Sequence, residues 1–388
     1  MAPLPVRRIV ALSAASFGVL GACLTLPGTL LPLLVERFGI RLVEAGSMLA
    51  LQPIGYLLSV LAARRLIRAL GMRAVLAAAM FTSALGFGGF GFAGGWMSGA
   101  LMMFVAGLGF GVMEVATNTL LITAGGERRT NILNFAHLFF GIGSFLAPPI
   151  VAAAVAAGMS WRIAFVVAAG VLGGVAAGWN TAELHVHGTT ADGAARGPTP
   201  WRARSAVLCA LMLAVYVGVE IGIGGWLTKY MVSVRGVTLT YAGNVLSLYW
   251  MGLAAGRLFL SALAHRVREA ALLLGLAAFS TVSAVAALLV GQPWLAGVGF
   301  AATGLGFSGI FPTVVALGGR YHPHDAAGVT SVMTAGAAVG GIVIPWTMSA
   351  IADGFGLTTG MAFYAALCAL LALLAAGIRC ALPAHDAA

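Results

Sequence analysis

The chain has 388 residues, of which 61% are hydrophobic and 8% are charged, whereas a soluble domain carries about 25% charged residues. The mean hydropathy of +1.01 and the long apolar runs exclude an ordinary water-soluble fold and predict a membrane protein. The net charge of +10 does not indicate a nucleic-acid partner, because the basic residues stand in short gaps between apolar runs and form no basic face.

Apolar stretches of about 20 residues, the length that spans a bilayer as a helix, recur along the whole chain. The first follows Arg7 and Arg8 and continues to about Leu34, which is too long for the apolar core of a signal peptide, so we expect an uncleaved first helix. Twelve spans are predicted in this way, at residues 10–34, 43–63, 73–93, 97–122, 132–156, 162–181, 205–229, 240–264, 269–290, 293–317, 325–350 and 359–380.

One long polar interruption separates the sixth stretch from the seventh. Residues 184–204 are rich in Gly, Thr, Asp, Arg and Pro, which is typical of a flexible linker. The sequence therefore predicts two six-helix halves, at 1–183 and 205–388, joined by a cytoplasmic linker.

The basic residues predict the orientation of these helices. If the N-terminus lies in the cytoplasm and the spans alternate, fifteen of the 21 basic residues fall in cytoplasmic segments and five in external ones, with Arg257 inside a helix. Because cytoplasmic loops carry an excess of Lys and Arg, we expect both termini in the cytoplasm.

The two halves resemble each other when the chain is shifted along itself by 197 residues. GIRLVEAGSML at 39–49 then lies over GVTLTYAGNVL at 236–246, and GLGF at 107–110 lies over GLGF at 304–307. The shift carries six helices, an even number, so the halves have the same orientation. Such parallel six-helix halves are found in one large class of membrane transporters. The fold class predicted is an all-α membrane protein of two parallel repeats.

Four polar residues gather on the predicted fourth and fifth helices. Glu114 and Asn118 lie one turn apart and share a face, and Asn134 and His137 lie three residues apart on the next helix. An ionisable group in hydrocarbon costs about 2.5–3.5 kcal/mol, so such a group needs an explanation. The shift pairs Glu114 with Phe311, so the constellation is asymmetric, which favours a binding or proton site over a shared architectural network. The structural alternative for His137 is an imidazole bonded to a helix carbonyl.

The second half has one acid well inside a predicted helix, Glu220, and it too lacks an acidic mate under the shift. It is a candidate proton or solute site, with Trp226 further along the same helix; the alternative is an acid paired with a neighbouring helix. Amides bond to hydroxyls and aromatic rings stack on the apolar faces of sugars. Helices two and eight offer four candidates of this kind, Gln52, Tyr56, Tyr249 and Trp250, although packing or anchoring at the membrane interface would also explain their aromatic rings.

Other side chains suggest no chemistry. Arg257, near the cytoplasmic end of the eighth helix, can extend toward water and is interpreted as a gate or helix-end anchor. The scattered cysteines, Cys23, Cys209, Cys368 and Cys380, lack the spacing of a metal site or a disulfide framework. No nucleophile triad or phosphate loop stands out, so we expect no enzyme activity, no cofactor and no bound metal.

Three segments resemble the fucose and glucose–galactose permease branch of the major facilitator superfamily. They are NILNFAHLFFGIGSFLAPPI at 131–150, which follows Glu114 and Asn118, YVGVEIGIGGWL at 216–227, and SLYWMGLAAGR at 247–257. The resemblance covers nearly the whole chain. It implies sugar transport coupled to protons in the bacterial inner membrane, and it implies that Glu114 contacts the sugar.

The chain departs from this branch at the acid of the first helix. Fucose permease uses an aspartate there for the proton, but this sequence has Pro27 and Gly28 at that place. Glu220 could substitute, Glu114 could carry the proton itself, or transport could be uncoupled. The function predicted is alternating-access transport of a small, sugar-like solute by a monomer. The alternatives are a proton-driven exporter of a metabolite or drug and a non-transporting membrane sensor or scaffold.

Overall fold

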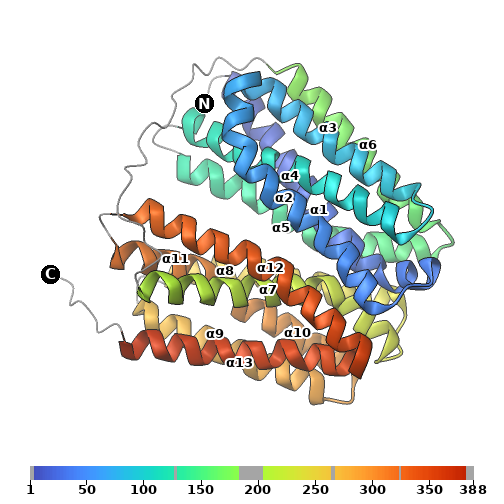
Figure 1. Ribbon diagram of the computed structural model, residues 1–388, viewed down its shortest axis with the longest axis vertical. Helices are drawn as coiled ribbons and strands as arrows, with labels where there is room; N and C mark the ends of the chain where they lie inside the picture. The colour runs from blue at the N-terminus through green and yellow to red at the C-terminus, as the bar shows by residue number, and fades with distance from the viewer. Residues whose placement is uncertain (1–3, 126–128, 183–203, 264–266, 323–324, 382–388) are drawn as a thin grey trace. The chain divides into compact units, whose positions relative to one another are not determined.

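The computed structural model describes residues 4–125, 129–182, 204–263, 267–322 and 325–381. These residues are almost entirely helical (Figure 1). Apart from Arg204, the predicted linker 184–204 lies outside the described residues.

Thirteen helices occupy the described part of the chain. They are α1 (Leu4–Phe38), α2 (Leu42–Leu70), α3 (Met72–Gly91), α4 (Trp96–Gly125), α5 (Arg129–Ala156), α6 (Trp161–Asn180), α7 (Arg204–Ser233), α8 (Leu239–Leu263), α9 (Glu269–Leu289), α10 (Pro293–Phe307), α11 (Ile310–Tyr321), α12 (Ala326–Phe355) and α13 (Leu357–Ala381).

The prediction of twelve spans is confirmed. Eleven stretches are long and apolar enough to cross a membrane, and one of them, Pro293–Tyr321, joins α10 and α11. The twelfth is α8, which has 25 residues.

The predicted span 293–317 lies within a single membrane span, Pro293–Tyr321, but that span consists of two helices. α10 ends at Phe307 and α11 begins at Ile310. The Ser308 hydroxyl donates to the Leu305 carbonyl at 2.6 Å, and a serine that bonds locally competes with the helical pattern. Gly309 follows it, and glycine is a poor helix former, so the two residues together interrupt the helix.

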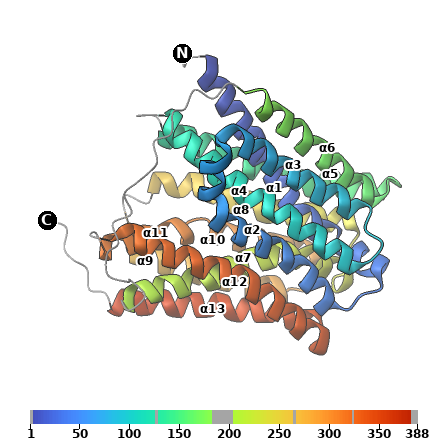
Figure 2. The ribbon, with the colours of Figure 1, turned by 45° about the horizontal axis from the view of Figure 1, so that its top comes forward.

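The internal repeat is visible in the helix packing. In the first half α1 packs on α5, and α3 packs on α4 and α6. In the second half α7 packs on α12, and α9 packs on α10 and α13, which are the same pairs after the shift. Figures 1 and 2 both show α7 and α12 running side by side.

Glycines at equivalent positions support the same repeat. Gly39 and Gly236, 197 residues apart, both have a positive φ, of 60° and 67°, in the turn after the first helix of each half. Gly107 packs against the Gln52 backbone carbonyl, and its mate Gly304 packs against that of Tyr249. Neither position leaves room for a Cβ atom, so α2 and α4 approach as closely as α8 and α10 do.

The helices form two compact units. The first contains α1 to α6 together with Thr238–Ser247, the beginning of α8. The second contains α7, the rest of α8 from Leu248, and α9 to α13. Each unit carries one of the two groups of polar side chains.

Candidate functional site

The first polar group lies where α4 and α5 face each other. Nε2 of His137 is 3.1 Å from Oδ1 of Asn118, so the imidazole donates from Nε2 to the amide oxygen. The Phe17 ring of α1 stacks on the imidazole with ring centroids 4.1 Å apart. The expected meeting of these two polar helix faces is confirmed, and the side-chain amide of Asn118 is a partner of His137.

Glu114 lies one helical turn before Asn118 on the same face of α4. It is half-buried, and the Tyr56 hydroxyl of α2 is within hydrogen-bonding reach of its carboxyl. A phenol can donate to a carboxylate, so Tyr56 offsets part of the cost of holding Glu114 inside the membrane span.

The remaining two candidates of the first unit differ in their exposure. Gln52 is buried one turn before Tyr56, and its backbone carbonyl is the surface on which Gly107 packs. Asn134 is exposed on α5, three residues before His137. The first unit thus combines a carboxyl, a phenol, three amides and an imidazole on α2, α4 and α5, which are groups that bond to hydroxyls. Their role in binding stays a prediction.

The second polar group is built around Glu220 on α7. Its carboxyl interacts electrostatically with the Arg257 guanidinium of α8 and lies near the Tyr216 hydroxyl, one turn earlier on α7. Tyr216 is fully buried, and its hydroxyl has no hydrogen bond of good geometry. Arg257 is exposed. It was expected as a gate or anchor, and the structure adds that it faces the acid.

Tyr249 is already engaged by the protein backbone. Its hydroxyl donates to the Glu220 carbonyl oxygen at 2.9 Å, and its side chain is fully buried. Its ring meets Trp250 edge to face, with centroids 5.4 Å apart. The observed contact ties α8 to α7, which is a packing role.

The two tryptophan candidates are both buried. Trp226 and Trp250 are 0% and 5% exposed, and neither indole N–H has a hydrogen-bond partner. Gly224 packs on the Trp250 ring. A buried donor without a partner is costly, and the role of these two side chains in binding stays a prediction.

Tyr216 and Phe17 were not singled out from the sequence. Tyr216 stands four residues before Glu220, a spacing that places both side chains on one face of a helix, so it could have been found. Phe17 contacts His137 across more than a hundred residues of chain, and no local pattern indicates that contact.

The fold and these polar groups define a class of protein. A multi-pass, all-helical chain of two parallel six-helix repeats, with ionisable groups inside its spans, has the architecture of a secondary transporter. Residues 13–345 match the family model of the Major Facilitator Superfamily. The chain belongs to that superfamily.

Part of the chain is similar in sequence to a named sugar transporter. Over 162 residues the chain is 29% identical to a glucose/galactose transporter of Brucella abortus biovar 1, strain 9-941. The match covers 40% of this chain and 38% of the relative, so it spans well under half of either protein.

Solved structures share the fold over nearly the whole chain. A bacterial homologue of the human lysosomal transporter Spinster, inward-facing and unoccupied, has a TM-score of 0.81 at 11% identity, with 97% of each chain covered. The transporter FucP in the outward conformation has a TM-score of 0.63 at 19% identity, covering 95% of this chain and 98% of its own. The expected resemblance to this superfamily and to its sugar permeases is confirmed.

Proposed function

We propose that this protein moves a small, hydroxyl-rich solute of the sugar class across the bacterial inner membrane. The observation that carries the proposal is the polar group of the first unit, in which Glu114 with Tyr56, and Asn118 with His137, offer donors and acceptors inside membrane spans. Carboxylate, amide and imidazole groups pair with sugar hydroxyls. The similarity to a glucose/galactose transporter supports the same solute class.

The mechanism proposed is alternating access. The halves 1–183 and 205–388, joined by the linker 184–204, rock around a central site in a monomer whose termini both lie in the cytoplasm. The excess of basic residues in the predicted cytoplasmic segments supports that orientation, and superfamily repeats of this kind support the rocking.

Protons are the proposed coupling ion. Glu114 binds solute or proton, with Asn118, Asn134 and His137 completing the site, while Glu220 is the second candidate for the proton. Glu220 faces Arg257, so protonation of the acid would release the guanidinium from an opposite charge. An exchange of partners of this kind is a means of linking proton binding to helix movement.

An exporter of an amphiphilic metabolite is the second candidate. The buried aromatic side chains around Glu220 favour it, because Tyr216, Tyr249 and Trp250 present rings to the same region of α7 and α8. Aromatic surfaces suit amphiphiles as well as sugar rings.

The deciding experiment is a ligand screen by thermal unfolding of the purified protein, with monosaccharides, sugar acids and amphiphilic drugs. A ligand that binds the folded state stabilises it by about 2.7 kcal/mol at 100 times its Kd. We expect a monosaccharide to raise the Tm of the wild type and of Glu36→Gln, an exposed acid at the end of α1, but not that of Glu114→Gln. A shift with amphiphiles alone, retained in Glu114→Gln, would contradict the sugar proposal and favour export.

A further inference from the structure

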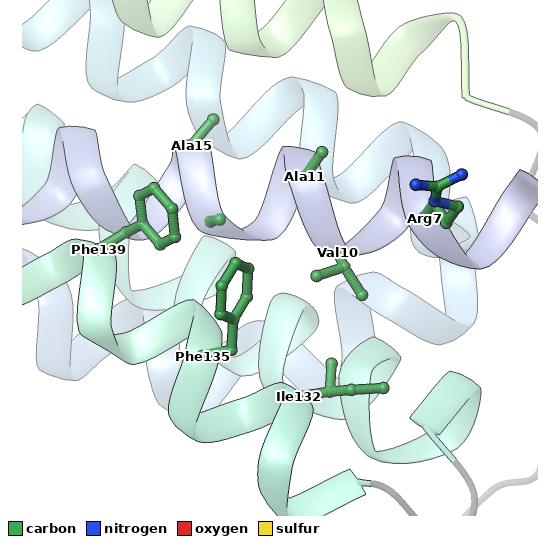
Figure 3. A pocket seen from close by; sticks show the side chains of 8 residues that line it. Arg7, Val10, Ala11, Ala15, Ile132, Phe135 and Phe139 are labelled. Carbon is green, nitrogen blue, oxygen red and sulfur yellow. The ribbon is translucent and has the colours of Figure 1, made fainter. Parts of the chain in front are cut away.

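A groove of about 590 Å³ runs between α1 and α5 in the first unit (Figure 3). Its lining comes from these two helices alone, and it consists of Arg7, Val10, Ala11, Ala14, Ala15, Ile132, Phe135 and Phe139. Three alanines on α1 leave space between the helices, and the rings of Phe135 and Phe139 stand along the α5 side (Figure 3).

The groove has one charged end. Arg7 is exposed and lies in the first turn of α1, three residues before the predicted first span at 10–34, so we expect its guanidinium at the depth of the lipid headgroups. The other lining side chains are aliphatic or aromatic. A hydroxyl-rich solute would find no hydrogen-bond partners along this apolar surface, whereas a hydrocarbon chain needs none.

The groove is separate from the polar group described above. His137 reaches Asn118 on α4, while Phe135 lines the groove. Phe135 and His137 are two positions apart in the chain, and residues at that spacing point about 200° apart around the axis of an α-helix. One face of α5 therefore contacts α4, and another face lines the groove.

The neighbouring Arg8 has a different role. Its guanidinium donates to the Thr181 hydroxyl at 2.7 Å, which ties α1 to the end of α6. Of this pair of cations, Arg7 lines the groove and Arg8 serves the packing of the unit.

We propose that the groove binds an anionic phospholipid, with one acyl chain along the apolar lining and the headgroup phosphate on Arg7. Arginine pairs with phosphate through charge-assisted hydrogen bonds. Basic positions between membrane helices at headgroup depth recognise anionic lipids in this way. The occupant is thus a component of the bilayer and not the transported solute.

The test measures which lipids stay bound to the intact purified protein. The protein is equilibrated with equal amounts of phosphatidylglycerol and phosphatidylcholine that carry the same acyl chains, and the bound lipids are counted by native mass spectrometry. We expect the wild type to retain phosphatidylglycerol preferentially. Arg7→Gln should reduce that preference about fivefold, the factor that one basic residue contributes near an anionic surface.

Two further variants separate charge from shape. Arg8→Gln is the matched control, because it removes the adjacent cation, and it should keep the preference. Ala11→Phe fills the groove from an exposed position of α1 and should reduce retention of both lipids. The Tm of each variant in detergent shows whether it is folded, and if Ala11→Phe fails to fold, the two arginine variants still decide the proposal.

Three results would overturn it. Equal losses in Arg7→Gln and Arg8→Gln would mean that diffuse surface charge attracts the lipid. Displacement of the lipid by soluble glycerol phosphate would mean that the site binds the headgroup alone and that the acyl chain does not contribute. Displacement by a monosaccharide would mean that the groove belongs to the solute site.

Discussion

Glu114 and Glu220 each have a tyrosine near the carboxyl, but the tyrosines come from different places. Tyr56 reaches Glu114 from another helix, whereas Tyr216 precedes Glu220 by one turn on the same helix. Only the second arrangement follows from local spacing. The Tyr56 hydroxyl, a neutral donor beside the Glu114 carboxyl, lowers the cost of placing that acid in the membrane.

The bond between His137 and Asn118 makes the first residue-scale prediction. His137→Ala removes a donor that orients the Asn118 amide. A hydrogen bond of this kind contributes about 1 kcal/mol, so the KM for the solute should rise about fivefold, measured by uptake into proteoliposomes. His137→Gln, which keeps a donor, should recover part of the loss, and Thr119→Ala, on an exposed neighbour of Asn118, should leave KM unchanged. An unchanged KM in His137→Ala would assign the pair to structure.

At the scale of the helices, the repeat places a glycine of one helix against the backbone of another at equivalent positions in the two halves. Gly107→Ala would drive a Cβ into the Gln52 carbonyl, and Gly304→Ala would drive one into that of Tyr249. Both variants should lower the Tm or prevent folding, because backbone on both sides leaves nothing flexible to move. Gly170→Ala, in α6 with no neighbour within 4 Å, is the control and should stabilise by up to about 1 kcal/mol. A tolerated Gly107→Ala would contradict the close packing of α2 on α4.

Two arginines on the predicted external side hold helix ends. Arg235 donates to the carbonyls of Ala287, Leu288 and Val290 at the end of α9, at 2.9, 2.8 and 2.6 Å. Arg162 donates to the Gly91 carbonyl at the end of α3, the mate of α9 in the repeat, at 2.6 Å. Cations at helix C-termini satisfy free carbonyls and the helix dipole, which explains basic residues on the side where few are expected.

This arrangement predicts a stability effect without a transport effect. Arg235→Met should lower the free energy of unfolding by about 1.5–3 kcal/mol, the range for hydrogen bonds to a charged group, measured as a lower Tm. The Tm of Arg235→Lys should lie between those of the wild type and Arg235→Met, because lysine keeps the charge but lacks the planar guanidinium that donates several hydrogen bonds. Arg37→Met, an exposed position at the end of α1, should have little effect. A loss in Arg37→Met equal to that in Arg235→Met would show that net charge is responsible.

At the scale of the whole molecule, each unit contributes one acid, and transport assays can separate their proposed roles. Glu220→Gln should abolish accumulation driven by a pH gradient but keep solute exchange, because exchange needs no net proton movement. Glu114→Gln should abolish both, because it removes a group that contacts the solute. Both assays use the same proteoliposomes, with Glu36→Gln as the control. Accumulation retained in Glu220→Gln would remove Glu220 from proton coupling.

The membrane class, the twelve spans and the parallel repeat were all determined by the sequence itself. Hydropathy and glycine spacing are properties of short stretches of chain, and they do not depend on how the helices pack. The helix break at Ser308 and Gly309 was not predicted, because both residues stand in an apolar stretch whose composition does not distinguish one helix from two. Only the tertiary structure decided which polar groups meet: Tyr56 with Glu114, His137 with Asn118, and the Tyr249 hydroxyl with the Glu220 backbone. These contacts depend on how each helix is rotated and how deeply it lies against its neighbours, and the packing of all side chains in a unit sets both.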